Sequence, residues 1–84
     1  MHKSPLTKLK KGLKARVVEI TGGRSLGHKL SMMGLRPGIQ ITKLNSFVLK
    51  GPVTVRAGHT VLALGHGMAE KVIVEVLPES PSKT

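Results

Sequence analysis

The 84-residue sequence contains no cysteine, tryptophan, tyrosine or aspartate, and Phe47 is its single aromatic residue. Without cysteine the chain can form no disulfide, no thiolate metal site and no cysteine nucleophile. Four glutamates supply all the carboxylate side chains, which leaves little for paired acid–base catalysis or for metals bound through oxygen. These absences argue against an enzyme and favour a binding module.

Long apolar segments are also missing. The longest unbroken apolar run is Val61–Leu64, whereas a membrane-spanning helix needs about 20 apolar residues. Hydrophobic residues make up 39% of the chain, which suffices for one small core. The basic N-terminus is not followed by the apolar segment of a signal peptide. We therefore expect one intracellular domain.

Positive charge is in excess and unevenly distributed. The formal net charge is +10, and six of the 14 Lys and Arg side chains lie within residues 1–16, which contain no acid. We expect a basic N-terminal arm at residues 1–12, a folded domain at residues 13–77 and a polar tail at residues 78–84. The arm either contacts phosphates or anionic lipid, or is a solvated terminus that aids solubility.

Residues 25–34 show the pattern of a short amphipathic helix. Leu26, Leu30 and Met33 fall on one helical face, and such a stripe usually packs against the core. Ser25 is predicted to cap the helix N-terminus through its side-chain oxygen.

A glycine and a proline end this helix and turn the chain. Gly34 suits the left-handed residue that follows a helix, and Leu35 suits the apolar contact back to the last turn. Pro37-Gly38 fits the central pair of a type II turn. We expect a purely structural turn role for Gly34, Pro37 and Gly38, and likewise for Gly22, Gly23, Gly51 and Pro52.

The rest of the chain has the alternation and turn signals of short strands. The predicted strands are 14–20, 39–44, 47–49, 53–57, 60–64 and 72–77. The apolar segment 60–64 is expected to be central in the sheet. A single sheet of this size must curl to cover its apolar face and its edges. The predicted fold class is mainly β, a small five-to-six-stranded β-barrel with a short helical insertion after the first strand.

The predicted helix and the turn after it are the candidate partner-binding surface. Met32 lies beside the apolar stripe, and an exposed methionine makes an adaptable apolar contact. The candidate contact residues are Lys29, Leu30, Met32, Leu35 and Arg36.

His28, His59 and His66 raise the question of a metal site, since neutral imidazole is a common ligand. No two of them lie three or four residues apart, and no cysteine or aspartate supports them. The spacing therefore supports no metal and no cofactor. The alternative is an adventitious zinc or nickel ion held between molecules.

Several short motifs occur in an order that resembles the FeoA family, the small cytosolic partners of the bacterial ferrous-iron transport system. The motifs are Gly22-Gly23 before the helix, M-G-L-R-P-G at 33–38, G-P at 51–52 and A-E-K-V-I-V at 69–74. Each motif alone is weak evidence for this resemblance, whereas the order and spacing of the motifs together are specific to the family. The resemblance covers about residues 13–77.

The resemblance implies an SH3-like barrel and a cytoplasmic accessory protein that binds and modulates the membrane transporter FeoB. It also implies a position beside the inner membrane, where a basic arm would meet anionic lipid. The same barrel forms the C-terminal domain of DtxR-like iron regulators, so the fold alone does not fix the partner.

The charge of +10 supports an alternative hypothesis, a small barrel that binds nucleic acid. Barrels that bind single strands stack the bases on aromatic side chains, and this chain offers only Phe47. A transporter adaptor is therefore the predicted function, nucleic acid is the less favoured partner, and the sequence predicts no oligomeric state.

Overall fold

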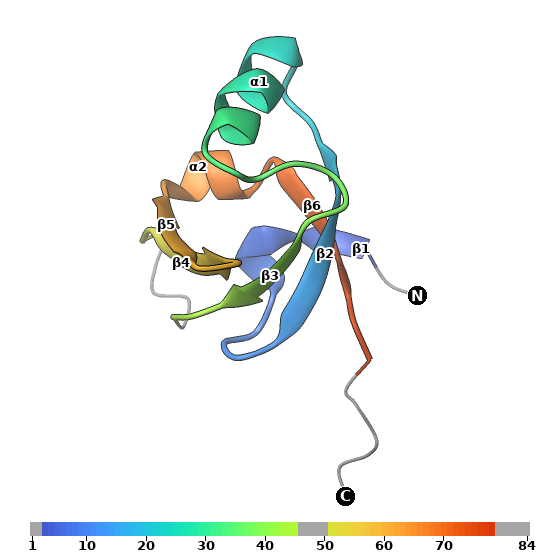
Figure 1. The fold of residues 1–84 in the computed structure, drawn as a ribbon, viewed down its shortest axis with the longest axis vertical. Helices are drawn as coiled ribbons and strands as arrows, with labels where there is room; N and C mark the ends of the chain where they lie inside the picture. The colour runs from blue at the N-terminus through green and yellow to red at the C-terminus, as the bar shows by residue number, and fades with distance from the viewer. Residues whose placement is uncertain (1–2, 46–50, 79–84) are drawn as a thin grey trace, which may run out of the picture.

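The computed structural model describes residues 3–45 and 51–78, which form one antiparallel sheet with three short helical segments (Figure 1). In chain order the elements are β1 (Lys3–Pro5), the 3₁₀ helix η1 (Leu6–Lys8), β2 (Lys14–Ile20), α1 (Arg24–Met32), β3 (Gln40–Lys43), β4 (Val53–Ala57), β5 (Thr60–Leu64), α2 (His66–Ala69) and β6 (Val72–Val76). The strand order across the sheet is β1-β6-β2-β3-β4-β5.

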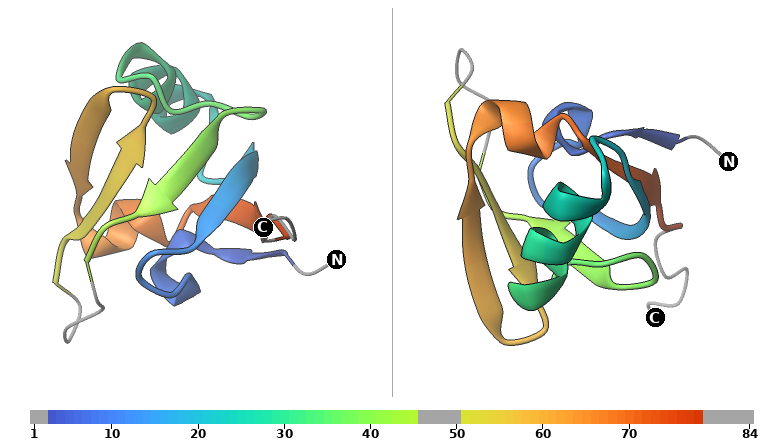
Figure 2. Two further views of the ribbon diagram at one scale, coloured as in Figure 1. Left: turned by 60° about the horizontal axis from the view of Figure 1, so that its bottom comes forward. Right: turned by 90° about the horizontal axis from the view of Figure 1, so that it is seen from above.

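The six strands bend around a single core, with β4 and β5 curving away from β2 and β6 (Figure 2). A register shift in β2 between Val17 and Glu19 adds local twist, as a bulge does. One contiguous cluster of buried apolar side chains fills the inside of the bend. The mainly β class and the helical insertion after Lys14–Ile20 are as predicted, whereas β1 was not among the predicted strands.

The N-terminal segment belongs to this fold, which corrects the expectation of a separate basic arm at residues 1–12. Lys3 lies opposite Glu75 in the pairing of β1 with β6. Leu6 and Leu9 are 0% and 3% exposed within the core. The sequence pattern of two leucines among lysines is too weak to predict that these leucines are buried, because their burial depends on docking against distant strands.

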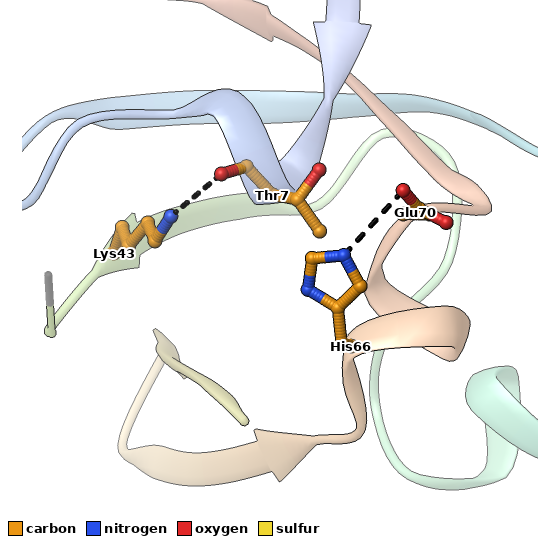
Figure 3. Close-up of polar contacts among 4 residues, drawn as sticks. All are labelled: Thr7, Lys43, His66 and Glu70. Atoms are coloured by element: carbon orange, nitrogen blue, oxygen red, sulfur yellow. Dashed lines mark hydrogen bonds and ion pairs between the residues drawn. The ribbon is translucent and has the colours of Figure 1, made fainter. Parts of the chain in front are cut away.

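Lys43 is the unexpected member of the interior. On β3, Thr42 is partly buried and Lys43, on the opposite face of the strand, is fully buried, with only 1% of its surface exposed. Its Nζ donates a hydrogen bond to the carbonyl oxygen of Thr7 at 3.2 Å (Figure 3). A second bond runs from Nζ to the carbonyl oxygen of Leu6 at 3.4 Å. Burial lowers the pKa of Lys43 from its usual value of 10.5, because desolvation disfavours the ammonium form. The side chain thereby ties β3 to η1.

The start of α1 differs from the prediction, whereas its end agrees. The N-cap is Gly23, which makes no side-chain capping bond, so Ser25 lies inside the helix and is not the cap. At the other end, the Leu35 N–H donates to the Leu30 oxygen and the Gly34 N–H to the Ser31 oxygen, both at 2.9 Å. This pair of bonds is the Schellman motif.

Gly34→Ala is expected to lower the free energy of unfolding by about 1–2 kcal/mol, because a residue with a β-carbon is strained in the left-handed region. Gly34 has φ 95°, and a Cβ there would meet no atom within 4 Å, so backbone strain alone is tested. Urea denaturation gives the comparison. The matched control is Gly65→Ala, at φ −61° and with equal open space. Equal losses in the two variants would contradict this account.

The turn after α1 forms as predicted and is bonded to the sheet. Gly38 has φ 96°, and the Ile39 N–H donates to the Arg36 oxygen at 3.1 Å, as in a type II turn. The Gly38 N–H also donates to the Val17 oxygen at 2.7 Å. The turn is therefore held rigidly against β2.

Two further predictions concern the second half of the chain. The expected strand at 47–49 lies outside the described residues. The segment Thr60–Leu64 forms β5, which pairs only with β4 among the described strands and so lies at an edge, which corrects the central position predicted for it. Val61 is accordingly 55% exposed. An apolar composition alone does not separate an edge strand from a central one.

Candidate interaction site on helix α1

Helix α1 stands at one end of the molecule, beyond the bent sheet (Figures 1 and 2). Leu30 is fully buried, and Leu26 and Met33 are partly buried against the core. The predicted apolar stripe therefore faces inward. The remaining sides of the helix face solvent and are open to a partner.

The structure separates the predicted contact residues into two groups. Lys29, Met32 and Arg36 are exposed, and 75% of the Met32 surface is accessible. Leu30 and Leu35 are 0% exposed, which corrects their prediction as partner contacts. They are the two residues joined by the Schellman motif, where an apolar contact normally accompanies the hydrogen bonds. We call Lys29, Met32 and Arg36 the Met32 face.

A second feature of α1 was not predicted from the sequence. An open groove of about 610 Å³ lies where α1 meets the end of β2 and the turn at 36–38. Its lining residues are Ile20, Gly23, Arg24, Gly27, His28, Ser31, Arg36 and Pro37. We call it the α1 groove. Gly27 and Ser31 are four residues apart and share one flank of the helix, whereas Lys29 and Met32 share another.

Positive charge surrounds both surfaces. Among the described residues, Arg24, Lys29 and Arg36 form no ion pair with a carboxylate. Within the described residues, the contact between an imidazole and a carboxylate lies elsewhere: His66 Nε2 on α2 is 3.5 Å from Oε2 of Glu70, the residue after this helix (Figure 3). The cations around α1 are therefore available to an external anionic group.

A second basic hollow lies on the outer face of the sheet. Lys14 pairs with Thr42, and Thr42 pairs with Arg56, so the three side chains cross β2, β3 and β4 in one row. With Gln40 and Gly58 they line a depression of about 390 Å³. We call it the sheet hollow. It is the surface that a nucleic-acid-binding function would use.

The three histidines do not converge. His28 lies on α1, His59 in the turn between β4 and β5, and His66 on α2. Over residues 3–45 and 51–78, no three His or Glu side chains are grouped so that they could hold a metal ion. In the same part of the chain, no helix has the length and hydropathy needed to cross a membrane.

The α1 region thus combines an adaptable apolar side chain with cations that form no ion pair in the part of the chain that the structure describes. Methionine contacts tolerate different partner shapes, and arginine binds carboxylates through two parallel hydrogen bonds. The arrangement suits contact with a protein. The Met32 face could be chosen from the sequence, because Met32 falls off the apolar stripe. The groove could not, because three separate segments form it.

Comparison with known proteins gives a consistent family assignment. The family model described as "FeoA domain" matches residues 4–76. A crystal structure of the iron uptake regulatory protein FeoA is 38% identical, with a TM-score of 0.81, over 92% of this chain and 100% of that chain. The solution structure of iron(II) transport protein A from Clostridium thermocellum is 29% identical, with a TM-score of 0.78, over 87% of this chain and 45% of that one.

A more distant likeness shows the fold alone. The regulator IdeR from T. acidophilum is 23% identical, with a TM-score of 0.77, over 90% of this chain and 35% of that chain. No curated protein sequence matches the chain significantly. The SH3-like fold expected from the motif order is confirmed by these structures. Because the family model spans most of the sequence and the crystallised FeoA aligns along its whole length, the chain belongs to the FeoA family.

Proposed function

We propose that this chain is a cytoplasmic accessory protein of ferrous iron transport that binds the cytoplasmic portion of the FeoB transporter and modulates it through protein contacts. The FeoA family is associated with ferrous iron transport. The observation that carries the choice of surface is the Met32 face, where a methionine that is 75% exposed accompanies Lys29 and Arg36. This region has the chemistry of a docking site.

Apolar burial and charge complementarity both favour binding of a partner at the Met32 face. Burying a methionine side chain that was exposed contributes roughly 1.5–3 kcal/mol, and an exposed apolar side chain gains this only when a partner covers it. Lys29 and Arg36 complement an acidic partner surface and speed the encounter. Neither effect requires a bound metal or a chemical step by this chain.

Met32→Ser and Arg36→Glu are each expected to weaken binding to the purified cytoplasmic portion of FeoB by about tenfold, or ~1.4 kcal/mol. Both residues are exposed, so thermal stability should stay unchanged. Isothermal titration calorimetry measures the affinity. Arg56→Glu in the sheet hollow is the matched control, since it reverses the same charge elsewhere. A loss as large for Arg56→Glu as for Arg36→Glu would contradict the proposed surface.

Binding to a membrane transporter would also place the chain near anionic lipid. Lys8 at the end of η1 and Lys10 and Lys11 after it are exposed, and juxtamembrane lysines contribute about 1 kcal/mol each near an anionic surface. Weak lipid contact through this loop is part of the proposal, although the segment is not a separate arm.

The sheet hollow supports the alternative of nucleic-acid binding less well. Lys14 and Arg56 would neutralise phosphates. None of the residues that line the hollow is aromatic, so bases would have no side chain on which to stack. Protein docking at α1 is therefore the better-supported function.

A further inference from the structure

We infer that the α1 groove binds an acidic segment of the partner protein, with a small apolar side chain over Gly27 and carboxylates on Arg24 and Arg36. The identity of the partner as FeoB rests on the proposed function. The chemistry of the segment follows from the groove itself. Lys29 and Met32 lie on a different flank of the helix from the groove-lining Gly27 and Ser31, and Arg36, which follows the helix, is the residue that the Met32 face and the α1 groove share.

Helix α1 carries a glycine, Gly27, in its interior. Glycine inside a helix is less favourable than alanine by about 0.5–1 kcal/mol. Gly27 has none of the positive φ angles seen at the turn glycines. A Cβ at this position would meet no atom within 4 Å. Within the described residues, neither backbone conformation nor close packing requires glycine here, whereas its missing side chain opens the groove.

The lining of the α1 groove is positively charged. Arg24, His28 and Arg36 come from two segments, and no acidic residue lines the groove. Arginine presents a planar fork that matches a carboxylate, while Ile20 and Pro37 supply apolar surface. A carboxylate-bearing segment therefore fits better than a basic or a purely apolar one.

A second copy of this chain is a poor occupant for the α1 groove. The chain carries a net charge of +10, so two copies repel each other at low ionic strength. The groove attracts negatively charged groups, and this chain has few of them. A different protein with an acidic surface segment is the occupant that charge complementarity selects.

The test fills the groove without disturbing the fold. Gly27→Gln introduces a good helix former into open space, and it should keep or raise the melting temperature. Ser25→Gln is the matched control, because Ser25 is exposed on the same helix but does not line the groove. Each protein is titrated with the cytoplasmic portion of FeoB and, separately, with the peptide Glu-Glu-Ala-Leu-Glu-Glu and its lysine counterpart.

We expect Gly27→Gln to weaken binding of FeoB and of the acidic peptide by about tenfold, whereas Ser25→Gln leaves both affinities within about twofold and the lysine peptide does not bind. Equal binding of the acidic and lysine peptides, or no binding of either, would overturn the inference. If FeoB binds but Gly27→Gln has no effect, the inference is wrong and the proposed function stands. If only the acidic peptide binds, the inference stands and FeoB is the wrong partner.

Discussion

Leu30→Ala is expected to lower the free energy of unfolding by about 2–5 kcal/mol, the range for removing a buried leucine side chain. Leu30 is 0% exposed in the core, and its carbonyl oxygen receives the Leu35 N–H at the end of α1. A domain of this length has a total stability of only about 4–13 kcal/mol. Urea denaturation followed by circular dichroism should therefore show a large shift in midpoint.

The control separates packing from partner contact. Leu30→Met keeps most of the volume and should change stability by less than about 1.5 kcal/mol. Because Leu30 is buried, Leu30→Met should also leave FeoB binding unchanged. A stable Leu30→Met protein that has lost binding would show that Leu30 contacts the partner, contrary to its position in the structure.

Lys43→Ala is expected to lower the free energy of unfolding by roughly 2–4 kcal/mol, because it empties the space of a long buried side chain. It also removes the donor to the Thr7 carbonyl oxygen, whereas the Leu6 oxygen keeps the Leu9 N–H at 3.1 Å. Lys43→Met also removes the donor to the Thr7 oxygen, but it retains most of the side-chain volume and removes the buried charge. We therefore expect a loss of about 1 kcal/mol at neutral pH, smaller than that of Lys43→Ala.

The pH dependence of stability provides a second measurement at this residue. The folded-state pKa of Lys43 is lowered below 10.5 by desolvation. Between the two pKa values the unfolded chain binds more protons at this residue than the folded chain does, so the free energy of unfolding rises with pH. The wild type should gain stability relative to Lys43→Met as the pH rises toward 10.5. A difference that is constant with pH would contradict the buried position of the ammonium group.

Local chemistry explains which parts of the fold could be predicted. Gly34 and the pair Pro37-Gly38 have the left-handed and type II conformations that their residue types favour. The strand Lys14–Ile20 was predicted with its observed bounds, because its β-branched residues end at a glycine turn. These features depend on neighbours in the sequence.

The parts that could not be predicted depend on distant contacts. The pairing of Lys3–Pro5 with β6 joins the two ends of the domain, and no local pattern encodes it. The burial of Lys43 requires carbonyl groups that lie 36 and 37 residues away in the sequence. In the sequence, Leu35 suited both an apolar contact at the helix end and a contact with a partner. The packed core shows that Leu35 is buried at the helix end, so it cannot also contact a partner.

The central claim is that this FeoA-family chain docks through α1, and a nuclear magnetic resonance titration tests it most directly. The ¹⁵N-labelled protein is titrated with the cytoplasmic portion of FeoB. We predict that the largest chemical-shift changes occur at Gly27, Ser31, Met32 and Arg36. Changes confined to Thr42 and the rest of the sheet hollow, or no changes at saturating FeoB, would contradict the claim.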